Sequence, residues 1–357
     1  MLDKNLFNQP LTSWMNGVGP EGDIVLSSRV RLARNLCKVP FPNRASVSQL
    51  AEVKNSIAAL LTDFAAVTGG EYQCIELDKL TVLERNVLIE KHLSSRNHVL
   101  NPEHRALVIS EDQRVSIMVN EEDHLRIQCM ELGLGTVSAL QKALAIDDAV
   151  EAKLDIAFNE KTGYLTSCPT NLGTGMRASV MVHLPGLVFT RQIGKIINAS
   201  TQLGFAVRGL YGEGTEVVGN IFQISNQLTL GFSEQEIVEN LTSAVLEIVT
   251  HERAARKALL AQSPDVVEDK VWRSLGILKY ARSITGREAL ALLSEVKMGI
   301  DMGIISAVAP TVFAELLVAS CANYLQNSIN NGNLAKREID KCRADIIRKT
   351  LGRSAEA

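Results

Sequence analysis

The sequence predicts an α+β fold, in which a central antiparallel sheet flanked by helices is followed by a small all-helical C-terminal domain. Strand-like apolar runs follow one another closely between residues 106 and 127, and the polar tip 111–113 joins the first two as a hairpin. Segments whose apolar residues have helical spacing precede and follow these runs. Beyond residue 261 the strand signals almost vanish, which indicates the helical tail.

The individual elements follow from hydrophobic periodicity and from local start and stop signals. The predicted strands lie at residues 106–109, 115–119, 125–127, 164–166, 178–183, 205–210 and 221–225. The predicted helices lie at residues 46–66, 81–93, 136–158, 190–203, 233–260, 266–283, 287–298, 311–329 and 334–351. Ser233 and Glu236 form a capping box at one helix start. Pro264 interrupts the helical pattern, so we predict a catalytic domain at residues 1–260 and a helical domain at 261–357.

Bulk composition excludes several classes of protein. The formal net charge of -3 gives no case for direct nucleic-acid or membrane binding. No apolar run is long enough to span a bilayer, and the first residues lack the pattern of a signal peptide. Six scattered cysteines without a Cys-x-x-Cys pair favour reduced thiols and no structural zinc site. We therefore expect a cytoplasmic protein.

The common phosphate-binding motifs are absent from the sequence. It has no Gly-x-x-x-x-Gly-Lys-Ser/Thr loop and none of the motifs of the Ser/Thr/Tyr protein kinases. Four other segments have unusual composition for their predicted positions: 27–35, 120–126, 168–177 and 208–216. Each has an ordinary alternative, namely a solvated basic strand, a charged turn, a loop around a buried cysteine and a flexible hairpin tip. Gly173 and Gly175 are interpreted as allowing close backbone approach to a ligand.

Together the four segments supply the parts for phosphoryl transfer to a cation. The five arginines at strand ends or loop edges are Arg29, Arg31, Arg126, Arg177 and Arg208, and the two acids are Glu122 and Glu213. Arginine binds phosphate oxygens through paired hydrogen bonds, but two arginines at 4 Å repel by about 4 kcal/mol at an effective dielectric of 20. A nucleotide triphosphate relieves that repulsion. Two carboxylates can hold a guanidinium and accept its proton.

The same segments resemble the phosphagen (guanidino) kinases. The matching motifs are Ser-Ser-Arg-Val-Arg at 27–31, Asn-Glu-Glu-Asp-His-x-Arg at 120–126, Cys-Pro-Thr-Asn-Leu-Gly-Thr-Gly at 168–175 and Arg-Gly-x-x-Gly-Glu-x-Thr at 208–215. The resemblance implies that the five arginines hold the ATP phosphates and that Glu122 and Glu213 hold and deprotonate the target guanidinium. It implies that Cys168 orients the target. Mg²⁺ would be bound mainly through the phosphates, with Glu121 at most an outer partner and no direct protein ligand.

Two departures from the small-substrate members favour a protein substrate. The first motif begins at Ser27, which leaves little room for the N-terminal domain that closes over small substrates, and the chain continues well beyond residue 260. Both features resemble the bacterial protein arginine kinases. In those kinases the tail dimerises and binds phosphoarginine, and the matching stretch here offers Arg337, Asp340 and Arg343 as a pocket. The alternative is an ordinary solvated helix face.

The resemblance implies phosphorylation of exposed protein arginines in a stress response. The implied partners are a zinc-binding activator protein, a Clp-type protease system, a heat-shock repressor and a second copy of the chain. A kinase for free arginine or another small guanidino compound is the main alternative. A catalytically dead phosphoarginine-binding module is a further alternative, which intact Glu122 and Glu213 disfavour.

Overall fold

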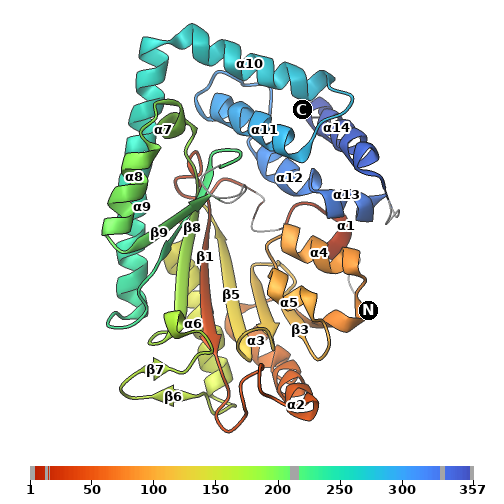
Figure 1. Cartoon of the computed structure of the whole chain (residues 1–357), viewed down its shortest axis with the longest axis vertical. Helices are drawn as coiled ribbons and strands as arrows, with labels where there is room; N and C mark the ends of the chain where they lie inside the picture. Colours follow the sequence, from red (N-terminus) through yellow and green to blue (C-terminus); the bar gives the residue numbers. More distant parts are fainter. Residues whose placement is uncertain (1–4, 13–14, 16, 210–216, 330–333, 354–357) are drawn as a thin grey trace.

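The computed structural model describes residues 5–12, 15, 17–209, 217–329 and 334–353 (Figure 1). Its largest feature is an eight-stranded sheet with antiparallel pairings in the order β2-β3-β4-β5-β1-β8-β10-β9. Its strands are β1 (Val25–Arg34), β2 (Tyr72–Glu76), β3 (Ala106–Ser110), β4 (Val115–Val119), β5 (Leu125–Leu132), β8 (Met176–His183), β9 (Phe205–Gly209) and β10 (Ile221–Asn226). A separate hairpin pairs β6 (Phe158–Asn159) with β7 (Gly163–Tyr164).

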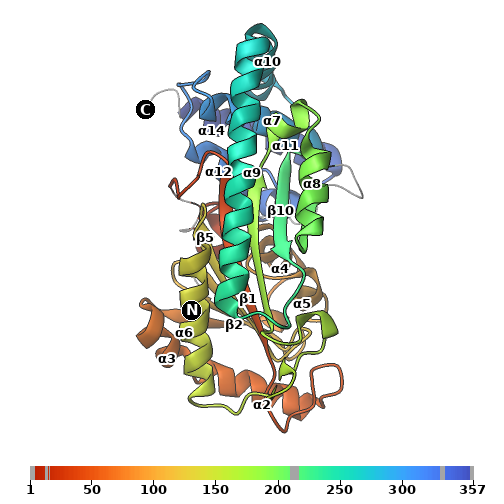
Figure 2. The same ribbon diagram turned by 90° about the vertical axis from the view of Figure 1, so that its left-hand side faces the viewer.

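Helices flank this sheet and then form the whole C-terminal part. Those of the sheet region are α1 (Asn5–Asn8), α2 (Val47–Ala58), α3 (Leu61–Thr68), α4 (Val82–Glu90), α5 (Arg96–Leu100), α6 (Thr136–Glu151), α7 (Pro185–Phe189), α8 (Ile193–Gln202) and α9 (Glu234–Gln262). Those of the tail are α10 (Pro264–Tyr280), α11 (Gly286–Asp301), α12 (Thr311–Ala319), α13 (Ala322–Ser328) and α14 (Lys336–Arg353). Figure 2 shows α9 running along the sheet and the tail helices gathered at one end. This arrangement confirms the predicted fold class.

The two faces of the sheet have different coverings. Val30 and Leu32 of β1 are fully buried in the core that α6 and α9 form on one face. Because side chains alternate along a strand, Arg29 and Arg31 lie on the opposite face. At one end of that opposite face a second core joins the sheet, for example Leu107, to α4 and the tail helices. The arginines occupy the part of the face beyond this second core.

Three predicted helices differ in extent from the observed ones, and main-chain hydrogen bonding explains one of the differences. The helix predicted at 136–158 ends at Glu151 because the following residues pair with the end of β1 instead. The Cys37 amide donates to the Asp155 carbonyl at 2.7 Å, and the Ala157 amide donates to the Asn35 carbonyl at 2.7 Å. The helix predicted at 46–66 is two helices, α2 and α3, and the one predicted at 190–203 begins at Ile193.

The helix predicted at 311–329 is also two helices, and a carboxylate from the sheet region explains the break. Glu90 at the end of α4 accepts hydrogen bonds from the main-chain amides of Asn323, at 3.0 Å, and Tyr324, at 2.7 Å. These amides belong to the first turn of α13, which needs acceptors. The Arg343 Nε group also donates to the Ser320 carbonyl at the break, at 2.7 Å. The turn expected at 330–333 lies outside the described residues.

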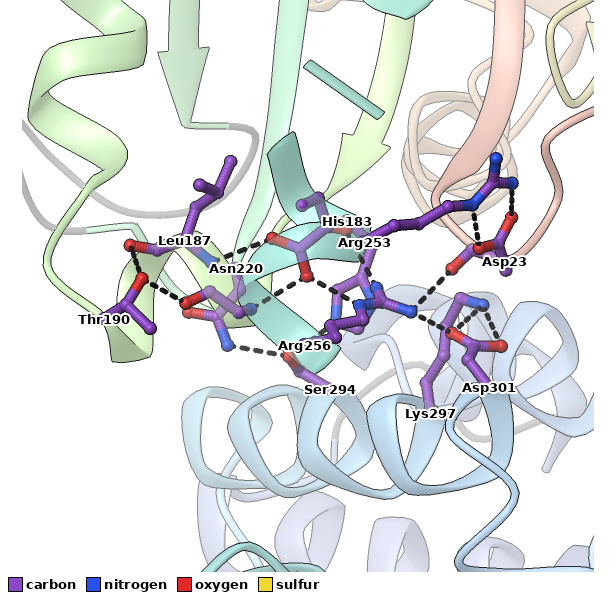
Figure 3. A network of polar contacts seen from close by, with 12 residues as sticks. Asp23, His183, Leu187, Thr190, Asn220, Arg253, Arg256, Ser294, Lys297 and Asp301 are labelled. Carbon is purple, nitrogen blue, oxygen red and sulfur yellow. Dashed lines mark hydrogen bonds and ion pairs between the residues drawn. The ribbon is translucent and has the colours of Figure 1, made fainter. Parts of the chain in front are cut away.

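A buried polar network links α9 to the first turn of α7 and to the tail (Figure 3). The Glu252 carboxylate on α9 is fully buried, and it accepts from the main-chain amides of Gly186 and Leu187, both at 2.8 Å. It also accepts from the Arg256 Nε at 2.6 Å, and Arg256 lies 3.4 Å from Asp301 on α11. The tail therefore contacts the sheet region through charged as well as apolar groups. The domain division at 261 stays a prediction, although α9 ends at Gln262 and α10 begins at Pro264.

We expect Glu252→Ala to lower the free energy of unfolding by about 3–5 kcal/mol, because it removes the carboxylate that pairs with the buried Arg256 Nε and accepts from two buried amides. Chemical denaturation monitored by circular dichroism measures this change. Glu247→Ala on the exposed side of the same helix is the matched control, with an expected change within about 0.5 kcal/mol. A loss for Glu252→Ala as small as that of the control would contradict the role assigned to the network.

Candidate functional site

Arginines from neighbouring strands meet on the open part of the sheet. Arg31 on β1 lies directly opposite Arg177 on β8, and Ala33 on β1 lies opposite Arg126 on β5. Arg29, two residues before Arg31, donates through Nη2 to Gln223 Oε1 on β10 at 2.9 Å. Four guanidinium groups predicted from the sequence are therefore brought together by strand register.

The fifth predicted arginine lies at the edge of this group. Arg208 is exposed on β9, and its charge acts on Arg177, whose pKa is lowered by burial first and by Arg208 and Arg126 next. Arg177 donates through Nη2 to Ser225 Oγ at 3.2 Å. Arg208 thus extends the positive surface to the last strand of the sheet.

Burial and mutual repulsion make the arginine cluster electrostatically costly. Burial, followed by the charges of Arg177 and Arg126, lowers the pKa of Arg29 to about 10. The pKa of Arg31 falls well below its ordinary value for the same reasons, with Arg29 contributing as well. Within the described residues, the Nε groups of Arg31 and Arg177 are buried without a hydrogen-bond partner. Like charges directly opposite across a strand pair are destabilising, so this arrangement fits a bound polyanion.

An acidic turn borders the arginines. Arg126 lies between two carboxylates, with Nη1 at 2.5 Å from Glu121 Oε2 and Nη2 at 2.9 Å from Glu122 Oε2. Glu121 is buried and also accepts from Ser95 Oγ at 2.5 Å, whereas the Glu122 side chain is 40% exposed. Arg126 therefore offsets the repulsion between these neighbouring acids. Glu121 fixes Arg126, and Glu122 remains accessible from outside.

The remaining residues of the acidic motif hold the turn in place. Asp123 Oδ1 accepts from Asn35 Nδ2 at 2.6 Å and from the Ser167 amide at 2.7 Å. His124 Nδ1 accepts from the Leu36 amide at 3.1 Å. These contacts fasten the turn to the end of β1 and to the segment before Cys168. The acidic motif thus holds one accessible carboxylate, that of Glu122, on a turn fixed by the side chains of Asp123 and His124.

Glu122, Cys168 and three of the arginines line one cavity of about 230 Å³. Cys168 precedes the short 3-10 turn Pro169–Asn171, and its Sγ lies 3.0 Å from Thr170 Oγ1. The cavity is also lined by Ala33, Thr170, Asn171 and Gly175. A carboxylate, a thiol and a cluster of arginines therefore face a common space.

Packing within the chain already requires the two glycines, and their close approach to a ligand stays a prediction. A Cβ at Gly173 would lie 2.4 Å from the Thr229 carbonyl oxygen, and one at Gly175 would lie 2.7 Å from the Ala33 carbonyl oxygen. Both residues also have positive φ, 101° and 63°. They allow the loop to pack against the chain itself, and thereby position Cys168.

A second, mostly apolar cavity of about 240 Å³ lies between the sheet and the tail. Its lining includes Ser27, two residues before Arg29, together with His92, Met181, Leu132 and, from the tail, Phe313. Burial, and secondly the charge of Arg29, lowers the pKa of His92 to about 4, so this imidazole is neutral. Sequence reasoning missed this cavity because its residues follow the pattern of ordinary core.

Other predicted residues lie apart from this site or outside the description. Glu213 falls among the undescribed residues. On α14, Arg337 is exposed, whereas Arg343 is buried, pairs with Asp340 at 2.5 Å and donates to the Ile284 carbonyl at 2.9 Å. Among the described residues, no group of three or more His, Cys, Asp or Glu side chains could hold a metal ion. None of the described helices is long and apolar enough to cross a membrane.

Two family models and several curated proteins match this chain. The family described as "ATP:guanido phosphotransferase, C-terminal catalytic domain" matches residues 52–255, and "Protein-arginine kinase McsB C-terminal domain" matches residues 264–357. A protein-arginine kinase from Desulforamulus reducens is 44% identical over 98% of this chain and 98% of its own length. One from Bacillus subtilis is 47% identical over 98% of this chain and 95% of its own length.

Solved structures of guanidino kinases share the fold. Lombricine kinase aligns with a TM-score of 0.57 and 30% identity, over 68% of this chain and 69% of that one. The duplicated taurocyamine kinase from Schistosoma mansoni aligns with a TM-score of 0.60 over 80% of this chain and 45% of that one. At 24% identity, the second likeness shows the fold alone.

Proposed function

The chain belongs to the ATP:guanido phosphotransferase family and, within it, to the protein-arginine kinases, and from this premise we propose which residues carry the reaction. It is an ATP-dependent kinase that phosphorylates arginine side chains of proteins. The observation that carries the assignment of roles is the single cavity in which Arg31, Arg126 and Arg177 face Glu122. A positive surface suits the phosphates of the donor, and a carboxylate suits the guanidinium of the acceptor.

The arginines would hold the triphosphate of ATP. Arg29, Arg31, Arg126, Arg177 and Arg208 span four strands, so together they can bind oxygens along a chain of phosphates. The unpartnered Nε groups and the lowered pKa of Arg31 support this role, because a polyanion stabilises the charged form. The apolar cavity beyond Arg29 would hold the nucleobase, with the neutral His92 at its wall. We assign Mg²⁺ to the phosphates themselves, where it would neutralise developing charge.

The acceptor side consists of carboxylates that hold a guanidinium. Glu122 already accepts a hydrogen bond from the Arg126 guanidinium, so its position suits this group. We assign it to hold the target arginine and to accept its proton during transfer, with Glu213 as the second carboxylate. A guanidinium has a pKa above about 12, so positioning beside a base is required for nucleophilic attack. The exposure of Glu122 leaves room for an arginine that is part of a protein.

We expect Cys168→Ala to lower kcat/KM by no more than about tenfold, the size of one lost hydrogen bond. The thiol lies beside the cavity, where it can orient a guanidinium nitrogen but takes no part in breaking the phosphorus–oxygen bond. Steady-state kinetics with a protein substrate measures the effect, with Cys37→Ala at an exposed free cysteine as the control. Complete loss of activity in Cys168→Ala would contradict this assignment and indicate a direct chemical role.

Incubation with ATP and either free arginine or an unfolded protein tests the acceptor. We expect transfer to the protein and little to free arginine, since the cavity around Glu122 is open. Efficient phosphorylation of free arginine with none on protein would favour a small-substrate kinase.

We further propose a cytoplasmic setting in a stress response, with a homodimer formed through the tail. A zinc-binding activator, a Clp-type protease system and a heat-shock repressor are the proposed partners, and α14 the proposed phosphoarginine sensor.

A further inference from the structure

A third cavity, of about 410 Å³, adjoins Glu122 and has none of the five clustered arginines in its lining. Glu122 belongs to the lining of both this cavity and the one that holds the arginines. We call the third cavity the outer cavity. Its walls come from the loop after β1 (Asn43), from α2 (Leu50) and from the loop between α5 and β3 (Asn101, Glu103). None of these residues is among the predicted site residues.

Hydrogen bonds hold the walls of the outer cavity in place. Asn120 Nδ2 donates to the carbonyls of Leu50 and His104, both at 2.9 Å, and so joins α2 to the loop before β3. Arg105 Nη1 donates to the His98 carbonyl at 3.2 Å. Ser167 Oγ donates to the Glu122 carbonyl at 2.7 Å. The outer cavity is therefore preformed, and a ligand need not order its walls.

One acidic side chain of the outer cavity is left to act on a ligand. Glu121 is engaged by Arg126 and Ser95, and Glu122 pairs with Arg126 at the boundary between the cavities. Glu103 is exposed, and within the described part of the chain no ion pair involves it. Arg105, on the same wall, keeps its positive charge but directs Nη1 to a main-chain carbonyl. Glu103 is thus the carboxylate of the outer cavity that has no ion-pair partner among the described residues.

We propose that the outer cavity receives the polypeptide segment that carries the target arginine, and that Glu103 selects against acidic neighbours of that arginine. The proposal rests on the assignment of Glu122 as the carboxylate that holds the target guanidinium. If the phosphates lie on the arginine side of Glu122, the methylene chain and backbone of the target must extend away from them. The outer cavity adjoins Glu122, has none of the five phosphate-assigned arginines in its lining, is open to solvent and is large enough for adjacent residues.

Three peptides that differ only beside a single arginine test the proposal, with the neighbouring residue being lysine, alanine or aspartate. For the wild-type enzyme we expect kcat/KM to fall from the lysine to the aspartate peptide by about two- to fivefold per charge, as for an exposed ion pair. Glu103→Lys should reverse the order, and Glu103→Gln should abolish most of the preference. The change should appear in KM for the peptide, with KM for ATP unaltered. High salt should reduce the difference between the lysine and aspartate peptides.

The matched control is Glu268→Lys, the same change of charge at an exposed position on α10, and α10 lies at the opposite end of the molecule from α2 (Figure 1). It should leave the order of the peptides unchanged. An active wild-type enzyme whose order of peptides is the same in Glu103→Lys would overturn the proposal while leaving the role of Glu122 intact. A wild-type enzyme that phosphorylates none of the three peptides would overturn the proposed function, and with it the role assigned to the outer cavity.

Discussion

Glu122→Gln should lower the rate of arginine phosphorylation by at least about a thousandfold, the combined effect of losing a positioned base and an oriented acceptor. The substitution keeps the shape of the side chain but removes the charge that faces a guanidinium. ATP should still bind within about twofold, because Arg126 retains its 2.5 Å ion pair with Glu121. Single-turnover kinetics and nucleotide titration measure the two effects separately.

Glu268→Gln on the exposed surface of α10 is the control for this experiment and should match the wild type. Glu213→Ala should lose phosphorylation to a similar extent, since the acceptor needs both carboxylates. Near-normal transfer by purified, folded Glu122→Gln would contradict the assigned role. A loss confined to ATP binding would instead indicate that Glu122 acts only by holding Arg126.

Arg31→Gln should lower kcat/KM for ATP by about a hundredfold or more and should raise the melting temperature in the absence of nucleotide. The loss follows from removing a charged donor from the phosphate site. The gain in stability follows because the half-buried Arg31 lies opposite Arg177 and its buried Nε has no partner among the described residues. Kinetics with varied ATP and a thermal melt of the nucleotide-free protein test both parts.

Arg273→Gln, at an exposed position on α10, is the matched control and should change neither quantity. The combination of lower activity and higher stability distinguishes a ligand-binding arginine from a structural one. A structural arginine such as Arg34, buried with Nη2 at 2.5 Å from Asp147, should lose stability when replaced. A fall in the melting temperature of Arg31→Gln would therefore contradict the account.

Much of the fold could be predicted because the central strands are continuous runs of apolar residues, which are buried in the structure. β2 was missed, since its residues are mostly half-buried at the edge of the sheet and give a weak pattern. The break between α12 and α13 could not be predicted because its cause, Glu90, lies far away in the sequence. Local signals predict local structure, whereas capping by a distant side chain depends on tertiary packing.

The candidate site was predictable in its residues but not in its geometry. The alternation of Arg29 and Arg31 along a strand predicts a shared face, but the pairing of Arg31 with Arg177 depends on the register of two distant strands. His92 carries no sequence signal of its own at a helix end, and only packing brings its ring near Arg29. Glu103 likewise follows the pattern of a surface loop residue.

We infer that this chain transfers the phosphoryl group of ATP to arginine side chains of proteins in the cavity that Glu122 shares with the arginine cluster. Mass spectrometry of an unfolded protein substrate, under conditions that preserve acid-labile phosphorus–nitrogen bonds, tests it most directly. The account predicts phosphate on arginine residues with the wild-type enzyme and ATP, and none with Glu122→Gln. Phosphate found only on serine, threonine or tyrosine, or phosphoarginine formed equally by Glu122→Gln, would contradict it.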